Sequence, residues 1–480
     1  MAHDGRTVSS NFLWRFMERF GAQGVGFIVS IVLGRILGPE VYGLVAIVTV
    51  FTTIVNVFVT CGLNDALVQK KDADDLDFST VFYFNLVMCL GLYTLLFLTA
   101  PLIARLYDNP ELIWPIRGLS LILIFGGIKN IQTAYVARHL IFKRFFYATL
   151  GGTLIAAVVG IWMALNGYGV WALIVQNLVN TCIDTIILWL TVKWRPKRMF
   201  SFERLKGLFS YAWKLLASTL IDTVYGKLYQ MVIGVRYSET DLAFYNKGDT
   251  FPNLLVTNIN DATNSVLLPV MSAEQENREM VKATTRKAIQ VSSFVIMPMM
   301  AGLAACAHPL VRLLLKEQWS PAVPFMQIFC FVYAFYCVHT ANLNAIKALG
   351  RSDLFLKLEI LKKIVGITTL LITVRISVLA MALGSIFNSV LSQLINSWPN
   401  RKLLDYHYGE QLRDMLPHIL LSLGMGGAVM AVQLLGLKDL PTLLIQIPLG
   451  VGLYVLGSHL LKVETLQLLK GLLRSYLHRK

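Results

Sequence analysis

The sequence LGRILGPEVYG, at residues 33–43, aligns without a gap on IGVRYSETDLA, at residues 233–243. In both stretches an apolar run ends in a short polar turn, and a second hydrophobic run follows. Few residues are identical, Gly34 and Gly234 being the clearest pair, so the match is one of pattern. Membrane chains with two similar halves usually hold their substrate near the bilayer midplane, where the halves meet. The offset of 200 residues therefore predicts a transporter with a working cleft between its halves.

The composition is that of a membrane protein. Of the 480 residues, 56% are hydrophobic and only 15% are charged, whereas about 25% of residues are charged in an ordinary soluble domain. About fourteen apolar stretches are long enough to cross a bilayer as helices. We expect them at residues 12–34, 41–60, 80–104, 113–135, 145–165, 169–192, 208–235, 243–270, 284–306, 322–346, 352–374, 376–398, 415–436 and 440–461. The predicted fold is an all-α polytopic membrane protein with two six-helix lobes and two C-terminal helices.

The predicted domains follow the repeat. Residues 1–200 form an N-terminal six-helix lobe, residues 201–400 a C-terminal six-helix lobe, and residues 401–480 two extra transmembrane helices with a basic cytoplasmic tail. An even number of spans in each half gives both copies the same orientation, related by an axis along the membrane normal. Charged residues interrupt the first apolar run and no small-residue cleavage site follows, so we expect the first helix to stay in the mature protein.

The net charge of +15 has a positional explanation. Lys and Arg gather in every second loop, as in residues 193–207, 272–287 and 399–414, and basic residues are retained on the cytoplasmic side. We therefore expect a multi-pass protein of the bacterial cytoplasmic membrane with both termini in the cytoplasm. The basic residues punctuate membrane spans instead of forming one patch, which argues against a nucleic-acid partner.

No cofactor is expected. The six cysteines lie mostly in apolar runs, and their spacing resembles neither a disulfide framework nor a zinc site. The loops are too short for a nucleotide-binding domain, and the chain has no GxxxxGK[ST] loop to bind ATP phosphates. Energy must therefore come from an ion gradient, the membrane potential or the substrate gradient, with Na⁺ and H⁺ as the candidate coupling ions.

Ionisable residues inside spans are costly, and each is a candidate functional residue. The first span carries Arg15, Glu18 and Arg19 on the same helical face as several small residues, which predicts the lining of a water-filled cleft. The alternative is that both arginines only reach the cytoplasmic headgroups. The fourth, seventh and tenth spans add Lys129, Lys214, Asp222, Lys227 and Lys347.

The eighth predicted span is the least membrane-like. Its polar residues step by three, four or seven positions along the helix, at Asn246, Asp249, Asn253, Asn260, Asp261 and Asn264, with Thr257 between them. Lipid cannot face such a stripe, because unsatisfied amides and carboxylates in hydrocarbon cost several kcal/mol each. The stripe predicts a surface on an aqueous cavity, and interhelical hydrogen bonding is the alternative.

The residue types indicate a substrate class. A cationic cleft suits phosphate and pyrophosphate oxygens, and the amides, hydroxyls and carboxylates of the seventh and eighth spans suit sugar hydroxyls. A cation exporter would instead need a cavity dominated by carboxylates, and only Asp222, Asp249 and Asp261 qualify. No Ser/His/Asp, metal-ligand or paired-carboxylate arrangement is present, so we do not expect an enzyme.

At this point the chain resembles the Wzx-type polysaccharide flippases, the polysaccharide-transporter branch of the MATE/MurJ-like (MOP) superfamily, and within it the colanic-acid and teichuronic-acid exporters. The resemblance covers nearly the whole length. It rests on residues 33–44, on GLNDALVQKK at 62–71, on LPVMSAEQ at 268–275, and on PLVRLLLKEQW at 309–319 with PAVP at 321–324. These are signatures of a fold, so they specify the family well and the substrate poorly.

The resemblance implies two six-helix lobes in a V, a central cationic cavity and alternating access. It also implies a cargo of undecaprenyl-pyrophosphate-linked oligosaccharide, moved from the cytoplasmic to the outer leaflet for capsule, exopolysaccharide or lipopolysaccharide synthesis. Related flippases carry arginines on the first helix, at places comparable to Arg15 and Arg19. The expected partners are this lipid, the bilayer, and the polysaccharide polymerase and chain-length machinery. The alternative function is a multidrug or cation exporter with the same fold.

Overall fold

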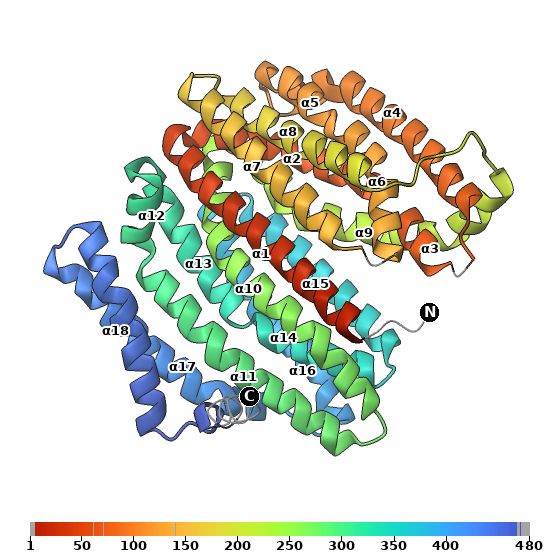
Figure 1. Ribbon diagram of the computed structural model, residues 1–480. Helices are drawn as coiled ribbons and strands as arrows, with labels where there is room; N and C mark the ends of the chain where they lie inside the picture. The colour runs from red at the N-terminus through yellow and green to blue at the C-terminus, as the bar shows by residue number, and fades with distance from the viewer. Residues whose placement is uncertain (1–4, 61, 71, 140, 468–470, 472–480) are drawn as a thin grey trace. The chain divides into compact units, whose positions relative to one another are not determined.

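The structure is a computed structural model that describes residues 5–60, 62–70, 72–139, 141–467 and 471. The side chains of residues 5–13, 15–16, 19–20 and 211 lie outside this description. Every regular element in the described part is a helix (Figure 1). The all-α expectation is therefore confirmed.

The described residues divide into two compact units between Ala243 and Phe244. The helices of the N-terminal unit are α1 (Gly5–Ile36), α2 (Pro39–Thr60), α3 (Leu63–Gln69), α4 (Asp75–Leu106), η1 (Pro110–Leu112), α5 (Ile113–Ser120), α6 (Ile122–Arg138), α7 (Lys143–Leu165), α8 (Val170–Thr191) and α9 (Phe202–Arg236). Helix α10 (Glu239–Ala273) crosses from this unit into the next.

The C-terminal unit continues with the rest of α10. Its further helices are α11 (Arg278–Ala305), α12 (Ala307–Leu315), η2 (Glu317–Ala322), α13 (Val323–Ala334), α14 (Tyr336–Ala348), α15 (Ser352–Thr373), α16 (Val378–Leu403), α17 (Tyr408–Ala431), η3 (Val432–Leu435) and α18 (Asp439–Leu460). Helices α17 and α18, blue in Figure 1, pack side by side.

The element order repeats with the predicted offset. Helix α1 ends at Ile36 and α2 begins at Pro39, while α9 ends at Arg236 and α10 begins at Glu239. In each half the fourth span is preceded by a 3₁₀ turn and broken in two, as α5 with α6 and as α13 with α14. Helices α17 and α18 follow the second half. The repeated halves with two additional helices are thus present in the chain.

The compact units do not divide where the repeat does. Helix α9, the first of the second half, packs against α2, α3 and α4, so it belongs to the N-terminal unit. The domain boundaries at residues 200 and 400 describe the repeat, and they stay a prediction.

Ten helical segments among the described residues are long and apolar enough to cross a membrane. The other predicted spans fall on α1, α9, α10 and α15, which are also helical. In the part of α1 whose side chains are described, the apolar stretch is Gly21–Ile36. The count of fourteen therefore stays a prediction. Helices α1, α9 and α10 carry most of the residues that the sequence selects as functional candidates.

The helices of each unit pack around apolar clusters. In the N-terminal unit, Leu33 and Ala172 belong to a cluster of α1, α2, α7 and α8, and Phe78 and Ile131 to one of α3, α4, α6 and α9. In the C-terminal unit, Val429 belongs to a cluster shared by α11, α17 and α18. Many large apolar side chains remain exposed on the outer helices, as on α4, α7 and α8, and such surfaces belong against lipid.

Candidate functional site

The first-span candidates are described only in part. Arg15 and Arg19 lie on α1, and their side chains are outside the described residues. Glu18 is half-buried, and its Oε1 accepts a hydrogen bond from Thr149 Oγ1 of α7 at 3.3 Å. This bond joins two helices of the N-terminal unit.

Lys129 on α6 is held by an ion pair. Its Nζ lies 2.7 Å from Asp184 Oδ2 on α8, and the two side chains are 30% and 14% exposed. Asp184 is not among the residues selected from the sequence, although its charge, opposite to that of Lys129 and also inside a predicted span, was a signal for this pair. The pairing neutralises Lys129, which had been predicted to add positive charge to a cleft.

The remaining lysines differ in their surroundings. Lys214 and Asp222 on α9 are exposed, and Lys227 donates a hydrogen bond to Gln230 Oε1 at 3.1 Å. Lys347, at the end of α14, is exposed and lies over the ring of Phe355, 4.3 Å from its centroid.

The polar stripe of α10 forms hydrogen bonds with α13 and α14. Asp249 Oδ1 accepts from the Tyr333 hydroxyl at 2.9 Å. Asn264 Oδ1 accepts from Asn344 Nδ2 at 2.6 Å, and Asn260 Oδ1 accepts from Thr340. For these three residues the structure shows the interhelical hydrogen bonds that were the alternative to a cavity surface.

Asn253 and Asn246 form no side-chain hydrogen bond with a neighbouring helix among the described residues. Asn253 is half-buried and bonds along its own helix, to Asp249 at 3.2 Å and Thr257 at 2.6 Å. Asp261 is half-buried. Asn246 is also half-buried, and its Oδ1 is a buried acceptor for which the described residues supply no donor. Asn246 therefore has hydrogen-bonding capacity for a group from outside the chain.

Lys247 is a buried charge that the sequence reasoning missed. Its side chain is on α10, the residue is 7% exposed, and its Nζ lies 5.6 Å from the ring centroid of Trp319. Any ionisable residue within a predicted span is a candidate. Lys247 was overlooked because it lies off the stripe of amides and carboxylates.

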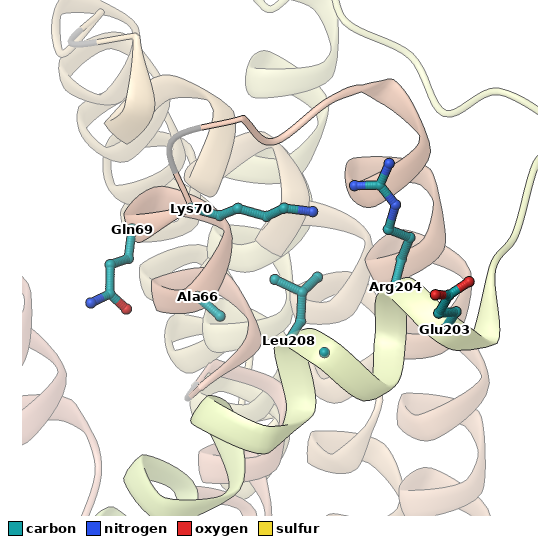
Figure 2. A pocket seen from close by; sticks show the side chains of 7 residues that line it. Ala66, Gln69, Lys70, Glu203, Arg204 and Leu208 are labelled. Atoms are coloured by element: carbon teal, nitrogen blue, oxygen red, sulfur yellow. The ribbon is translucent and has the colours of Figure 1, made fainter.

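An ionic clasp joins α3, α4 and α9 around a cavity of about 780 Å³ in the N-terminal unit. Figure 2 shows Lys70 extending from the end of α3 toward Arg204 on α9. Both cations converge on Oδ2 of the fully buried Asp77, at 2.6 Å from Lys70 and 3.6 Å from Arg204. The clasp ties the start of α4 to the first helix of the second half.

The N-terminus of α4 is itself capped within this clasp. The Asp74 carboxylate accepts from the backbone N–H of Asp77 at 2.9 Å, and Asp77 accepts from that of Asp74 at 3.2 Å. The hydrogen bond from Asp77 lowers the pKa of Asp74 below its ordinary value, and Arg204 lowers it further, against an opposing effect of burial. Asp74 therefore stays ionised to a lower pH than an unperturbed aspartate.

The C-terminal unit has the corresponding clasp with its charges reversed. Here the cation, Arg286, lies on α11, and its Nη2 is 2.5 Å from Asp414 Oδ1 on α17. The Tyr406 hydroxyl donates a hydrogen bond to the other oxygen of Asp414 at 2.7 Å. The pKa of Tyr406 is raised, mainly because the side chain is buried and also because of this hydrogen bond. In the N-terminal unit the acid is on α4, the third span of the first half, and the base is on α9, the first helix after that half. In the C-terminal unit the base is on α11, the third span of the second half, and the acid is on α17, the first helix after it.

No metal site accompanies these groups: within the described part of the chain, no cluster of three or more His, Cys, Asp or Glu residues is arranged to hold an ion.

Comparison with known proteins decides the family. A family model described as polysaccharide biosynthesis protein matches residues 32–324, more than half of the chain. The chain belongs to this family. The resemblance seen in the sequence motifs is confirmed, and this member of the family is a multi-pass membrane protein.

Two curated relatives of this polysaccharide biosynthesis protein are named for related processes. The succinoglycan biosynthesis transport protein ExoT of Rhizobium meliloti (strain 1021) is 25% identical over 323 residues, 67% of this chain and 65% of the relative. The teichuronic acid biosynthesis protein TuaB of Bacillus subtilis (strain 168) is 22% identical over 394 residues, 80% of each chain.

Two solved structures show that the fold is shared. The lipid II flippase MurJ in an inward closed conformation matches with a TM-score of 0.75 and 15% identity, covering 94% of this chain and 98% of that one. An inward-facing multidrug resistance MATE family transporter of the MOP superfamily matches with a TM-score of 0.61 and 16% identity, covering 79% and 94%. At these identities the likeness establishes the MurJ/MATE-type fold, as the sequence predicted.

Proposed function

We propose that this protein moves undecaprenyl-pyrophosphate-linked oligosaccharide repeat units from the cytoplasmic to the outer leaflet of the bacterial cytoplasmic membrane. The observation that carries the proposal is the family match over residues 32–324. Its support is that one relative is named as a transport protein for succinoglycan, another as a teichuronic acid biosynthesis protein, and the fold is also that of a lipid II flippase.

In this proposal, different residues bind the pyrophosphate and the sugar parts of the cargo. Arg15 and Arg19 bind pyrophosphate oxygens, because guanidinium groups match them with paired hydrogen bonds. Asn246, Asn253 and Asp261 bind sugar hydroxyls. Asn246 is the best supported of these, since its buried Oδ1 lacks a donor among the described residues. Asp249, Asn260 and Asn264 hold α10 against α13 and α14.

The remaining features of the proposal follow the sequence. Both termini lie in the cytoplasm, transport proceeds by alternating access, and a Na⁺ or H⁺ gradient or the membrane potential supplies the energy. On the outer side the polysaccharide polymerase and chain-length machinery receive the flipped lipid.

The experiment is to measure the lipid-linked intermediate in cells that lack the gene, using a membrane-impermeant probe to assign the leaflet. We expect undecaprenyl-pyrophosphate oligosaccharide to accumulate in the inner leaflet and the intact gene to reverse this. The double substitution Arg15→Ala/Arg19→Ala should fail to reverse it at normal expression, whereas Arg35→Ala, an exposed arginine on the same helix, should succeed. An unchanged pool with normal surface polysaccharide would refute the proposal.

The second candidate is a multidrug or cation exporter, which the fold likeness to the MATE transporter favours. That likeness supports the architecture alone, and the family match favours the flippase. Drug hypersensitivity of the deletion strain with unchanged surface polysaccharide would reverse this order.

A further inference from the structure

A second cavity, of about 500 Å³, lies at the start of α11 in the C-terminal unit. Arg278, Lys282 and Arg286 line it from one face of α11, because they are four residues apart along the helix. Lys402, in the last turn of α16, adds a fourth cation. The positive end of the α11 dipole points to the same place.

Acids and cations are equal in number around this cavity, and only two of the four cations form an ion pair. Asp414 pairs with Arg286, and Glu410 lies 3.7 Å from Lys282, which also donates to the carbonyl oxygen of Asp405. Glu279 and Asp405 line the cavity as well. Among the ion pairs of the described residues none includes Arg278 or Lys402, and both are exposed.

The N-terminal cavity of Figure 2 differs in this respect. There Lys70 and Arg204 both reach the buried Asp77, so its cations already have an anionic partner. The two cavities occupy comparable places in the repeat, and among the described residues only the one at α11 keeps cations, Arg278 and Lys402, that form no ion pair.

The position of the α11 cavity points to lipid. Both α11, which begins there, and α16, which ends there, are long and apolar enough to cross a membrane. Along α16, Leu394, Trp398 and Lys402 follow one another at four-residue steps; Leu394 is 41% and Trp398 70% exposed. Exposed tryptophan at the end of a span marks the level of the headgroups.

We propose that this cavity binds the phosphate of an anionic membrane lipid. Arg278 and Lys402 contact the phosphate oxygens, and an acyl chain lies along Leu394 and Trp398. Basic pockets between membrane helices at the headgroup level bind lipids in this way. The site is separate from the cargo residues and does not depend on which molecule is transported.

The test uses the purified full-length protein in detergent with fluorescent phosphatidylglycerol as the probe. The variant Arg278→Gln/Lys402→Gln removes the two cations that form no ion pair. The matched control, Lys287→Gln/Arg401→Gln, removes two exposed charges from the same helices outside the cavity lining. We expect the cavity variant to bind the fluorescent lipid about thirtyfold more weakly, because each basic residue contributes to the binding of anionic lipid. We expect the control variant to bind the lipid almost as strongly as the parent protein does.

The other outcomes are decisive in the same way. Equal loss in both variants, or in neither, would overturn the site. A further outcome is that inorganic phosphate displaces the fluorescent lipid at the concentration at which the lipid itself binds, and that this displacement also depends on Arg278 and Lys402. That result would assign the cavity to a soluble anion and overturn the proposal of a lipid ligand. If the double variant does not fold, Lys402→Gln alone should weaken binding about fivefold, and unchanged binding in that variant would refute the proposal.

Discussion

At the scale of single residues, charges inside the helices find partners. Lys129 would be costly in a span by itself, because desolvating an ammonium group outweighs most single contacts. The carboxylate of Asp184, 2.7 Å away on a neighbouring helix, offsets that cost. The pair is part of the internal structure of the N-terminal unit.

Substituting one partner of this ion pair should destabilise the protein more than replacing both partners by apolar residues. Asp184→Asn leaves the ammonium group without its partner, and we expect a loss of about 2 kcal/mol in the free energy of unfolding, less than for a fully buried pair because Lys129 is partly exposed. Lys129→Met/Asp184→Leu should recover most of that loss. Thermal unfolding in one detergent measures both. A double variant less stable than Asp184→Asn would contradict this account, and lost transport in a stable double variant would assign the pair to function.

The residue scale also shows where sequence reasoning stops. The sequence identifies Lys129, Asp249 and Asn264 as polar groups within helices, and that is correct. Whether such a group faces a cavity or another helix depends on which span is its neighbour, and residues 55 or 80 positions away supply the partners. Periodicity gives the face of a helix and does not give what lies opposite to it.

At the scale of elements, the amides of α10 should behave as interhelical hydrogen bonds. Asn264→Leu leaves the amide of Asn344, which is 5% exposed, without its acceptor. We expect this to cost about 1–3 kcal/mol in the free energy of unfolding, the penalty of an unpaired buried polar group. Asn264→Leu/Asn344→Leu should be nearly as stable as the parent and should transport normally. A stable double variant that cannot transport would show that these amides contact the substrate.

The reversed clasps give a second prediction for the elements. Arg286→Glu places a second carboxylate against Asp414, whose side chain is 5% exposed. We expect a loss of about 1–2 kcal/mol, less than for a fully buried pair because the Arg286 side chain is 52% exposed. Arg286→Glu/Asp414→Arg should restore much of it, because it gives this clasp the charge order of the N-terminal one. Lys287→Glu, on the adjacent exposed position, is the control. Thermal unfolding of the four proteins decides, and a swapped variant no more stable than Arg286→Glu would refute the clasp.

The elements themselves were largely predictable. Every predicted span coincides with a helix or a broken pair of helices, because long apolar runs bounded by basic loops leave few alternatives. The breaks at α5–α6 and α13–α14 were not predicted, since no proline or glycine occupies Leu121 or Phe335 at the junctions. The clasps were missed because the pairs Asp77–Arg204 and Arg286–Asp414 join helices that are more than a hundred residues apart in the sequence.

At the scale of the whole molecule, the two repeated stretches have a physical reason to keep small residues. Within the N-terminal unit, α2 packs against α9. Gly43, in the first stretch, lies against the backbone of Glu239, in the second, and Gly234 lies against the ring of Tyr107. The repeat was visible in the sequence as a pattern, but the contact between its two copies requires the fold.

Substituting Gly43 should therefore disturb the connection between the halves. A Cβ at this position would overlap the carbonyl oxygen of Glu239, which is backbone and cannot rotate away. We expect Gly43→Ala to lower the free energy of unfolding by about 1–3 kcal/mol, as for other overpacked contacts, and to reduce polysaccharide export. Gly38→Ala is the matched control, since a Cβ there meets no atom within 4 Å and should change stability by less than about 0.5 kcal/mol. Thermal unfolding and surface polysaccharide are measured for both variants; equal behaviour would mean that the two repeated turns do not meet in the working protein.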